Sequence, residues 1–246
     1  MERLTLTVTD NRQIANGIWE MKLSGCTAAC RPGQFVNLMI GDNFLRRPIS
    51  VCNWEDGILT LAYKIVGKGT SEMAAMKPGA AIDTLVPLGN GFDTSVDCGS
   101  ALLVGGGIGT APLYMLARTL AAKGCKVTLV TGYRNAGEIF FADEFKALGI
   151  DVLVATEDGS CGTKGFVTDA IRQNAVDYDY IYACGPMPMM KALCAATDTA
   201  GEMSLEERMG CGFGICMGCT CKTKSGHKRV CKEGPVFTKE DIEWDA

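Results

Sequence analysis

The chain has 246 residues, 47% of them hydrophobic and 21% charged, and its formal net charge is −4. This length allows one to two domains and a small module, and the acidic balance argues against nucleic acid as the main partner. No run of 18 apolar residues exists that would predict a membrane-spanning helix. The N-terminus alternates like a strand and shows no basic-then-apolar leader, so we expect a cytoplasmic protein whose thiols stay reduced.

Residues 1–97 predict a β domain. Short apolar or alternating runs are separated by turn-rich stretches at residues 4–8, 18–23, 34–39, 49–52 and 58–65. Strands at a spacing of roughly ten residues are typical of a barrel or a sandwich, and we expect an antiparallel β-barrel as the first part of an α+β multidomain chain. A helix is predicted over 70–76, because Lys77-Pro78-Gly79 is a helix-stop signal.

Two motifs in this segment suit a phosphate-containing cofactor. The first is Arg47-Pro48-Ile49-Ser50, placed between the third and fourth predicted strands, whose guanidinium matches pyrophosphate geometry. By itself the motif is also compatible with an edge strand that carries a proline. The second motif spans 66–71, where Gly69 and Thr70 begin the predicted helix and place free N–H groups at its N-terminus. A plain glycine turn is the alternative.

From residue 101 the pattern changes to alternating strands and helices. Strands are predicted at 101–104, 126–131, 151–155 and 180–183, and helices at 111–123, 142–148, 167–173 and 188–196. This alternation favours a parallel sheet covered by helices on both faces, over residues 98–200.

A glycine-rich loop follows the first of these strands and leads into its helix. It differs from G-x-G-x-x-G, but its glycines serve the same purpose of letting the backbone approach a dinucleotide pyrophosphate. We expect cofactor contacts from its residues Gly105, Gly106, Gly107, Gly109 and Thr110.

Two further strand ends fall at the edge of the sheet where ligands bind in such folds. Cys184 and Gly185 end the fourth strand, and the Cys184 thiol is either near a nicotinamide or simply packed at the strand end. Asp158 follows the third strand and is either a cofactor contact or part of an ordinary turn. Arg134 follows the second strand and suits a 2′-phosphate or solvent, so these residues leave NAD and NADP both open.

The last segment, residues 201–246, carries a cysteine cluster. Cys211, Cys216 and Cys219 form a C-x4-C-x2-C loop with glycines between the cysteines, which is the plant-type [2Fe–2S] spacing. Cys231, expected on the return strand after the turn at 225–226, is the better fourth ligand, and Cys221 is the alternative. Four zinc ligands usually come from paired C-x2-C knuckles, whereas this segment has one such pair. A zinc site and a metal-free cysteine cluster are the two other interpretations of this segment.

The three signatures occur in an order that resembles the electron-transfer subunit of NAD-linked, two-subunit dihydroorotate dehydrogenases, in the ferredoxin-reductase superfamily. The resemblance covers essentially the whole chain, including 87–92 and 231–237. It implies bound FAD, one [2Fe–2S] cluster and NAD, and a separate FMN-containing catalytic subunit in a heterotetramer of two copies of each. It also implies that Arg47 pairs with the FAD pyrophosphate, that Ser50 approaches the isoalloxazine, and that Tyr63 and Lys64 contact the flavin.

The family role is to pass electrons from dihydroorotate oxidation on the partner through the cluster and FAD to NAD⁺, in the synthesis of UMP. No side-chain acid or base is expected in this chain. Three other functions remain to be separated from this one: the flavin and iron–sulfur subunit of a bifurcating or sulfide-linked NAD(P)H oxidoreductase, a redox sensor, and a zinc-binding structural subunit.

Overall fold

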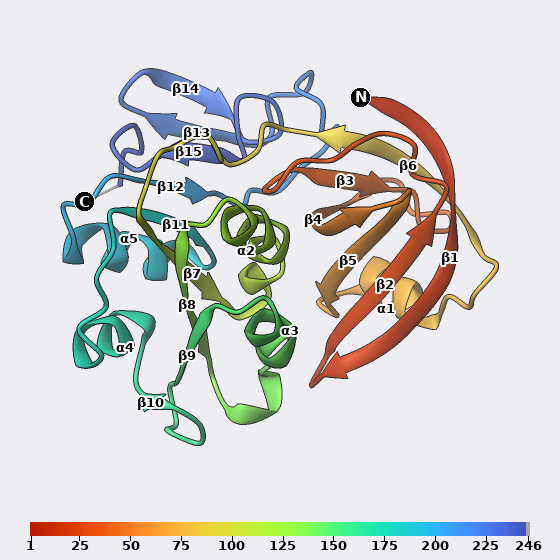
Figure 1. Ribbon diagram of the computed structural model, residues 1–246. Coiled ribbons are helices and arrows are strands. Elements are labelled where there is room, and N and C mark those ends of the chain that lie inside the picture. Colours follow the sequence, from red (N-terminus) through yellow and green to blue (C-terminus); the bar gives the residue numbers. More distant parts are fainter. Residues whose placement is uncertain (245–246) are drawn as a thin grey trace.

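The computed structural model describes residues 1–244, and its first part is a closed antiparallel barrel (Figure 1). Around the barrel the strands follow the order β1-β2-β5-β4-β3-β6. A short helix, α1 (Lys68–Ala75), lies between β5 and β6 in the chain. Side chains of the strands alternate between interior and exterior: Leu6 and Val8 are buried, whereas Thr5 before them and Thr7 between them are exposed. The strands are β1 (Glu2–Ala15), β2 (Ile18–Ser24), β3 (Phe35–Leu38), β4 (Arg47–Glu55), β5 (Ile58–Lys64) and β6 (Ala81–Leu88).

The barrel was predicted correctly as a class, with three differences in its strands. β1 continues to Ala15 beyond the predicted 4–8, because polar residues after Val8 still pair with β2 through two register shifts. β6 was not predicted, although it closes the barrel between β3 and β1. The Arg47–Ser50 motif lies inside β4, opposite β3, and not between strands.

A seven-stranded sheet forms the second part, in the order β10-β9-β8-β7-β11-β12-β15. All neighbours are parallel except β12 and β15. The predicted alternation of strands and helices is therefore confirmed. Its elements are β7 (Ser100–Gly106), η1 (Gly107–Thr110), α2 (Leu113–Ala122), β8 (Lys126–Tyr133), η2 (Ala136–Glu138), α3 (Ala142–Ala147), β9 (Asp151–Thr156), β10 (Thr163–Lys164), α4 (Val167–Gln173), β11 (Tyr180–Cys184), α5 (Met187–Ala196), β12 (Gly201–Ser204) and β15 (Val236–Thr238).

Two apolar cores cover the two faces of this sheet. In β7, Leu103 packs in the core that contains α2 and α3, whereas Leu102 and Val104 pack in the core that contains α4 and α5. The α2/α3 core also includes Ile18 and Cys52 of the barrel, so this face of the sheet rests against the barrel (Figure 1). The carboxyl ends of the parallel strands therefore lie next to the barrel.

Residues from 201 onward join the sheet before and after the cysteine loop. β12 pairs with β11 and β15 pairs with β12, although neither strand was predicted. Between them, β13 (Thr220–Thr223) and β14 (Gly226–Arg229) form the predicted hairpin. Cys231 lies just beyond β14 and not on the return strand itself. Within residues 1–244, no helix is long and apolar enough to cross a membrane.

Candidate functional site

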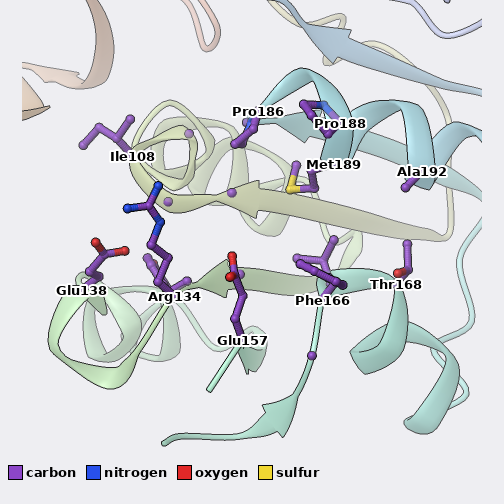
Figure 2. Close-up of a pocket in the computed structure, with 18 of the residues that line it drawn as sticks. Ile108, Arg134, Glu138, Glu157, Phe166, Thr168, Pro186, Pro188, Met189 and Ala192 are labelled. Atoms are coloured by element: carbon purple, nitrogen blue, oxygen red, sulfur yellow. The ribbon is translucent and has the colours of Figure 1, made fainter. Parts of the chain in front are cut away.

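Two adjoining cavities lie where the barrel meets the sheet. The smaller one has a volume of about 360 Å³ and is lined mainly by β4, β5, the start of α1 and the segment after β12. The larger one, about 780 Å³, lies over the carboxyl ends of β7, β8, β9 and β11 (Figure 2). Both fall within the range of roughly 300–1,000 Å³ that is usual for small-molecule and cofactor sites.

The smaller cavity brings together most of the residues predicted to bind flavin. Arg47, Pro48, Ile49 and Ser50 reach it from β4, Tyr63 and Lys64 from the end of β5, and Thr70 from α1. Ile108, Ala111 and Pro112 close it from the sheet side. The Tyr63 hydroxyl donates to Asn11 Oδ1 at 2.9 Å, and burial raises the pKa of this phenol to about 12, so it stays protonated at neutral pH.

Gly69 does not line the cavity, but its lack of a Cβ leaves the space that the Arg47 side chain occupies. A Cβ at Gly69 would lie 2.0 Å from Arg47 Nε and 2.8 Å from its Cζ. The guanidinium thus lies directly against the backbone of the first turn of α1. It donates to the Leu45 carbonyl at 2.6 Å and to Asn43 Oδ1 at 3.2 Å. A cation beside a helix N-terminus is a suitable place for pyrophosphate, because both attract anionic oxygens.

Thr70 has a role that the sequence did not predict. Its hydroxyl accepts the N–H groups of Val66 at 2.9 Å and Gly67 at 3.2 Å, and it donates to the Gly67 carbonyl at 3.0 Å. The side chain therefore organises the glycine turn. The N–H groups of the first turn of α1, which have no partner within the helix, remain for a phosphate.

The larger cavity contains the glycine loop after β7. Gly106, Gly107 and Gly109 line it, together with Gly185 after β11. A Cβ at Gly109 would lie 2.4 Å from the Cys184 carbonyl oxygen, so only glycine lets the loop pack against the end of β11. This close packing leaves the backbone of the loop facing the cavity, as a dinucleotide pyrophosphate requires.

Four of the residues predicted to bind NAD lie outside both cavities. Gly105 supports the loop from behind, since a Cβ there would lie 2.6 Å from Thr110 Oγ1, and Thr110 is itself fully buried. Asp158 is exposed and accepts the Ser160 hydroxyl at 2.6 Å and Ser160 N at 2.9 Å, and these bonds lower the pKa of its carboxyl. Cys184 is buried at the end of β11, where burial raises the pKa of its thiol.

Sequence reasoning missed several residues of the larger cavity. Glu157, directly before Asp158, lines it together with Arg134 (Figure 2). The bond from Glu157 N to the Tyr133 carbonyl, at 3.0 Å, continues the pairing of β9 with β8 and fixes this register. No local pattern in the sequence separates Glu157 from Asp158, because the pairing of β9 with β8 decides which of the two faces the cavity.

The two cavities share three wall residues, namely Lys64, Ile108 and Glu206. Lys64 of β5 forms an ion pair of 3.0 Å with Glu138 of η2, which ties the barrel to the sheet at this junction. Glu206 follows β12, and the surrounding protein raises the pKa of its carboxyl. A ligand in one cavity therefore lies next to a ligand in the other.

The four cysteines of the C-terminal segment form two pairs. Cys211 N donates to Cys216 Sγ at 3.4 Å, and Cys216 N donates to Cys211 Sγ at 3.5 Å. Cys231 N donates to Cys219 Sγ at 3.4 Å. Cys219 and Cys231 are buried, whereas Cys216 is exposed. Cys221 lies on β13, half-buried against the core of the sheet.

The electrostatics of these thiols suit a bound cation. Burial opposes ionisation of Cys211, yet N–H groups from Cys216, Phe213 and Ile215 together bring its pKa down to about 6. Burial and the neighbouring Cys219 thiol raise the pKa of Cys231 to about 12. Four thiolates can gather here only if metal charge compensates them.

The pairing indicates the kind of metal centre. A tetrahedral zinc ion needs all its ligands around one point. Two cysteine pairs with backbone N–H groups directed at sulfur fit a two-iron cluster better.

The smaller cavity is lined in part by residues that flank the cysteine loop. Met209, which lines the cavity, precedes Cys211 by two residues, and Pro235, also in the wall, follows Cys231 by four. Both flanks of the loop therefore contact the space predicted for flavin. The larger cavity, the smaller cavity and the cysteine loop therefore lie in succession.

Comparison with known proteins agrees with this arrangement. Residues 206–243 match the family model for the iron–sulfur cluster binding domain of dihydroorotate dehydrogenase B, and residues 103–195 match the oxidoreductase NAD-binding domain. The electron transfer subunit of dihydroorotate dehydrogenase B (NAD(+)) from Fusobacterium nucleatum is 46% identical over 96% of this chain and 97% of its own length. The corresponding subunit from a Geobacillus strain is 44% identical over 98% of this chain and 99% of its own.

Solved structures show the same architecture. A chain of the NADH-dependent reduced ferredoxin-NADP oxidoreductase superposes with a TM-score of 0.88 at 32% identity, over 97% of this chain and 90% of its own. Phthalate dioxygenase reductase superposes with a TM-score of 0.64 at 26% identity, over 79% of this chain and 64% of its own. Identity is higher to the dihydroorotate dehydrogenase subunits than to the bifurcating enzyme. On fold, site and sequence, the chain belongs to the family of electron transfer subunits of dihydroorotate dehydrogenase B (NAD(+)).

Proposed function

We propose that this chain is the subunit that carries electrons from a dihydroorotate dehydrogenase catalytic partner to NAD⁺, using FAD and one [2Fe–2S] cluster. When bound, the cluster would supply one-electron transfer from the FMN of the partner, and FAD would collect two electrons and one proton from solvent before hydride transfer to the nicotinamide. The observation that carries the proposal is the succession of two cavities with shared wall residues and a cysteine loop whose flanking residues, Met209 and Pro235, line the smaller cavity.

The residues of the smaller cavity would hold FAD. Arg47 and the first turn of α1 would bind its pyrophosphate, while Ser50, Tyr63 and Lys64 line the same cavity and Lys64 also lines the larger one. The Lys64–Glu138 ion pair would hold the barrel and the sheet at a fixed separation, so that the two rings meet in one orientation. No side chain is required to transfer a proton.

The residues of the larger cavity would select NAD. The glycine loop would bind the pyrophosphate, and Glu157 would accept the ribose hydroxyls of the adenosine. The same carboxylate would repel the 2′-phosphate of NADP, which makes Arg134 a partner for the pyrophosphate or the adenine. Glu157 is thus proposed to decide between the two dinucleotides.

The four cluster ligands are proposed to be Cys211, Cys216, Cys219 and Cys231. The loop between them presents three exposed apolar side chains, Phe213, Ile215 and Met217, beside the exposed Cys216. Apolar side chains around an exposed ligand suit a docking surface, because close approach of a partner shortens the path for an electron. We infer that the FMN subunit binds here, in a heterotetramer of two copies of each subunit.

The proposal also assigns one task to each predicted unit: FAD binding to residues 1–97, NAD binding to 98–200 and cluster binding to 201–246. It places the complex in the cytoplasm, where the cluster thiols are not lost to disulfides, and its work in the synthesis of UMP.

An anaerobic visible spectrum of the purified chain, recorded before and after NADH, tests the proposal. We expect one FAD and about two irons per chain, with both chromophores bleached by NADH. An Ile215→Lys variant should keep this reaction but fail to couple to the FMN subunit. Colourless protein containing zinc would contradict the proposal. Coupled reduction of ferredoxin in place of dihydroorotate oxidation would instead favour the bifurcating class, which the structural match at 32% identity makes the second candidate.

A further inference from the structure

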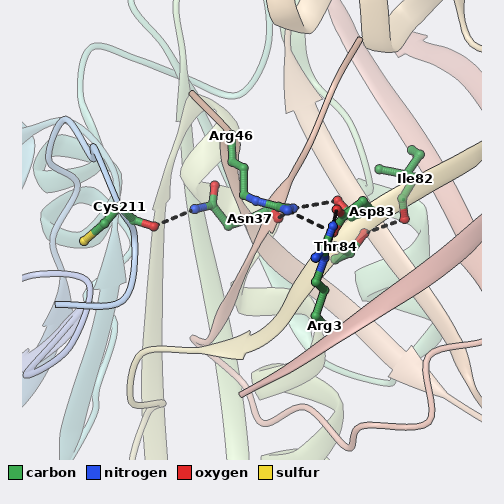
Figure 3. Close-up of polar contacts among 7 residues, drawn as sticks. All are labelled: Arg3, Asn37, Arg46, Ile82, Asp83, Thr84 and Cys211. Atoms are coloured by element: carbon green, nitrogen blue, oxygen red, sulfur yellow. Dashed lines mark hydrogen bonds and ion pairs between the residues drawn. The ribbon is translucent and has the colours of Figure 1, made fainter. Parts of the chain in front are cut away.

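Asn37 connects the barrel to the first cluster cysteine (Figure 3). It lies on β3 with 1% of its surface exposed, and its Nδ2 donates to the Cys211 carbonyl oxygen at 3.2 Å. The two residues are 174 positions apart in the sequence. Phe35, two residues earlier on β3, lines the flavin cavity. One short strand therefore contacts both the flavin cavity and the cysteine loop.

A charged network fixes β3 from behind. Arg46 donates to the Asn37 carbonyl at 3.3 Å and to the Asp83 carbonyl at 2.8 Å, and it pairs with the Asp83 carboxylate at 2.9 Å. Arg3 binds the same carboxylate at 2.6 Å from the other side (Figure 3). These bonds hold the backbone of Asn37 in place. Its side chain therefore extends toward the cysteine loop from a fixed position.

The loop is shaped to receive this amide. Gly212 has a φ of +78°, and a Cβ there would lie 2.4 Å from Asn37 Nδ2. Any side chain at this position would displace the amide from the Cys211 carbonyl. The glycine beside the first cysteine thus serves the contact with Asn37 as well as the turn of the loop.

Stability alone does not explain an asparagine at this position. Its Oδ1 is buried without a hydrogen-bond partner in the described part of the chain. Turning the amide over would not help, because the oxygen would then face the Cys211 carbonyl. An unpaired buried acceptor costs about 1–3 kcal/mol, a cost that an apolar side chain of the same size would avoid. The donated bond to Cys211 is the feature that the asparagine adds.

The two cysteine pairs differ in what holds them. Cys219 and Cys231 belong to the apolar core under the sheet. Cys211 is only half-buried and Cys216 is exposed, and neither belongs to an apolar core in residues 1–244. The hydrogen bond from Asn37 of the barrel therefore holds the Cys211–Cys216 pair in place, whereas apolar packing holds the other cysteine pair.

We propose that Asn37 is a positioning residue for the cluster, which holds the Cys211 peptide against the barrel and so sets the geometry of the exposed cysteine pair relative to the flavin. This inference rests on the proposed function. Ile215 and Cys216 direct N–H groups at Cys211 Sγ from 3.3 and 3.5 Å, and these bonds depend on the orientation of the peptide that Asn37 holds. Such N–H···S bonds tune the potential of an iron–sulfur cluster.

The test compares Asn37→Leu with Asn53→Leu in the complete chain loaded with FAD and cluster. Asn53 is the matched control, because it is a barrel asparagine on β4 whose Oδ1 is also buried without a partner in residues 1–244. We expect Asn37→Leu to keep its FAD, to change the EPR signal and midpoint potential of the reduced cluster, and to lose iron to a chelator about 10-fold faster. Asn53→Leu should match the unmodified chain in all three measurements.

A second variant guards against misfolding. Asn37→Ser adds no bulk and keeps the backbone bond to Arg46, but its hydroxyl is too short to reach the Cys211 carbonyl, so it should behave like Asn37→Leu. If the cluster of both variants keeps the EPR signal, potential and iron-loss rate of the unmodified chain, the inference is wrong while the proposed function stands. If the unmodified chain itself holds no cluster, the proposed function fails first.

Discussion

Substitution of Gly69 by alanine should separate flavin binding from folding. The new methyl carbon would lie 2.0 Å from Nε, 2.8 Å from Cζ and 2.9 Å from Cδ of Arg47, so the side chain must leave its place. Arg47 is partly exposed and can move into solvent at little cost to the fold. Alanine at the second position of α1 is also at least as favourable to a helix as glycine. We therefore expect no loss of thermal stability.

The substitution is instead expected to lower the affinity for FAD. A hydrogen bond to a charged group contributes about 1.5–3 kcal/mol when its partner would otherwise be left without it. Displacing Arg47 from the pyrophosphate should thus weaken FAD binding about 10- to 100-fold, at 1.4 kcal/mol for each factor of ten. Gly67→Ala is the matched control: a Cβ there meets no atom within 4 Å in the described structure, and its φ of 175° is extended backbone that any residue adopts.

The assay is a titration of the deflavinated chain with FAD, followed by flavin fluorescence, with a thermal melt of each apoprotein beside it. Gly69→Ala should lose affinity at unchanged melting temperature, and Gly67→Ala should lose neither. Equal FAD affinity in the two variants would refute the reasoning, because it would mean that Arg47 does not hold the cofactor. A large fall in melting temperature for Gly69→Ala alone would show that the arginine cannot move aside as described.

Three further predictions concern the other sites. Glu157→Gln should lower the preference for NADH over NADPH at least about 10-fold in steady-state kinetics, since it removes the charge that opposes a 2′-phosphate, while Asp158→Asn outside the cavity should leave the preference unchanged. Cys231→Ser should reduce iron from about two per chain to near zero, whereas Cys221→Ser should retain it; the reverse result would exchange the fourth ligand. Burial raises the pKa of Glu202 to about 7, although it accepts Asp93 N at 2.8 Å. The protonated carboxyl therefore contributes fully to stability below pH 4.5, and this contribution is lost as the pH rises through 7. In denaturant titrations, the free energy of unfolding of Glu202→Gln relative to the unmodified chain should therefore increase by about 1–2 kcal/mol between pH 5 and 8. A pH-independent difference would contradict this.

The amino-acid sequence determined the order of the three units and the chemistry of each, because these depend on local patterns. Period-two runs predicted a barrel, alternation of strands and helices predicted a parallel sheet, and the cysteine spacing predicted the cluster. Short-range hydrogen bonds and close packing impose such patterns within a few residues of the chain. For the same reason the sequence could predict Arg47, Ser50 and Gly107 as site residues, and these three line the two cavities.

Only the tertiary structure decided which neighbouring residue faces a cavity and which residues meet across domains. Glu157 and Asp158 are adjacent acids, and the register of β9 against β8 turns the first one inward. The unpredicted β12 brings Glu206 to the junction with Lys64, and β3 brings Asn37 to Cys211. Such contacts depend on how elements far apart in the chain pack and pair, and no local periodicity records them.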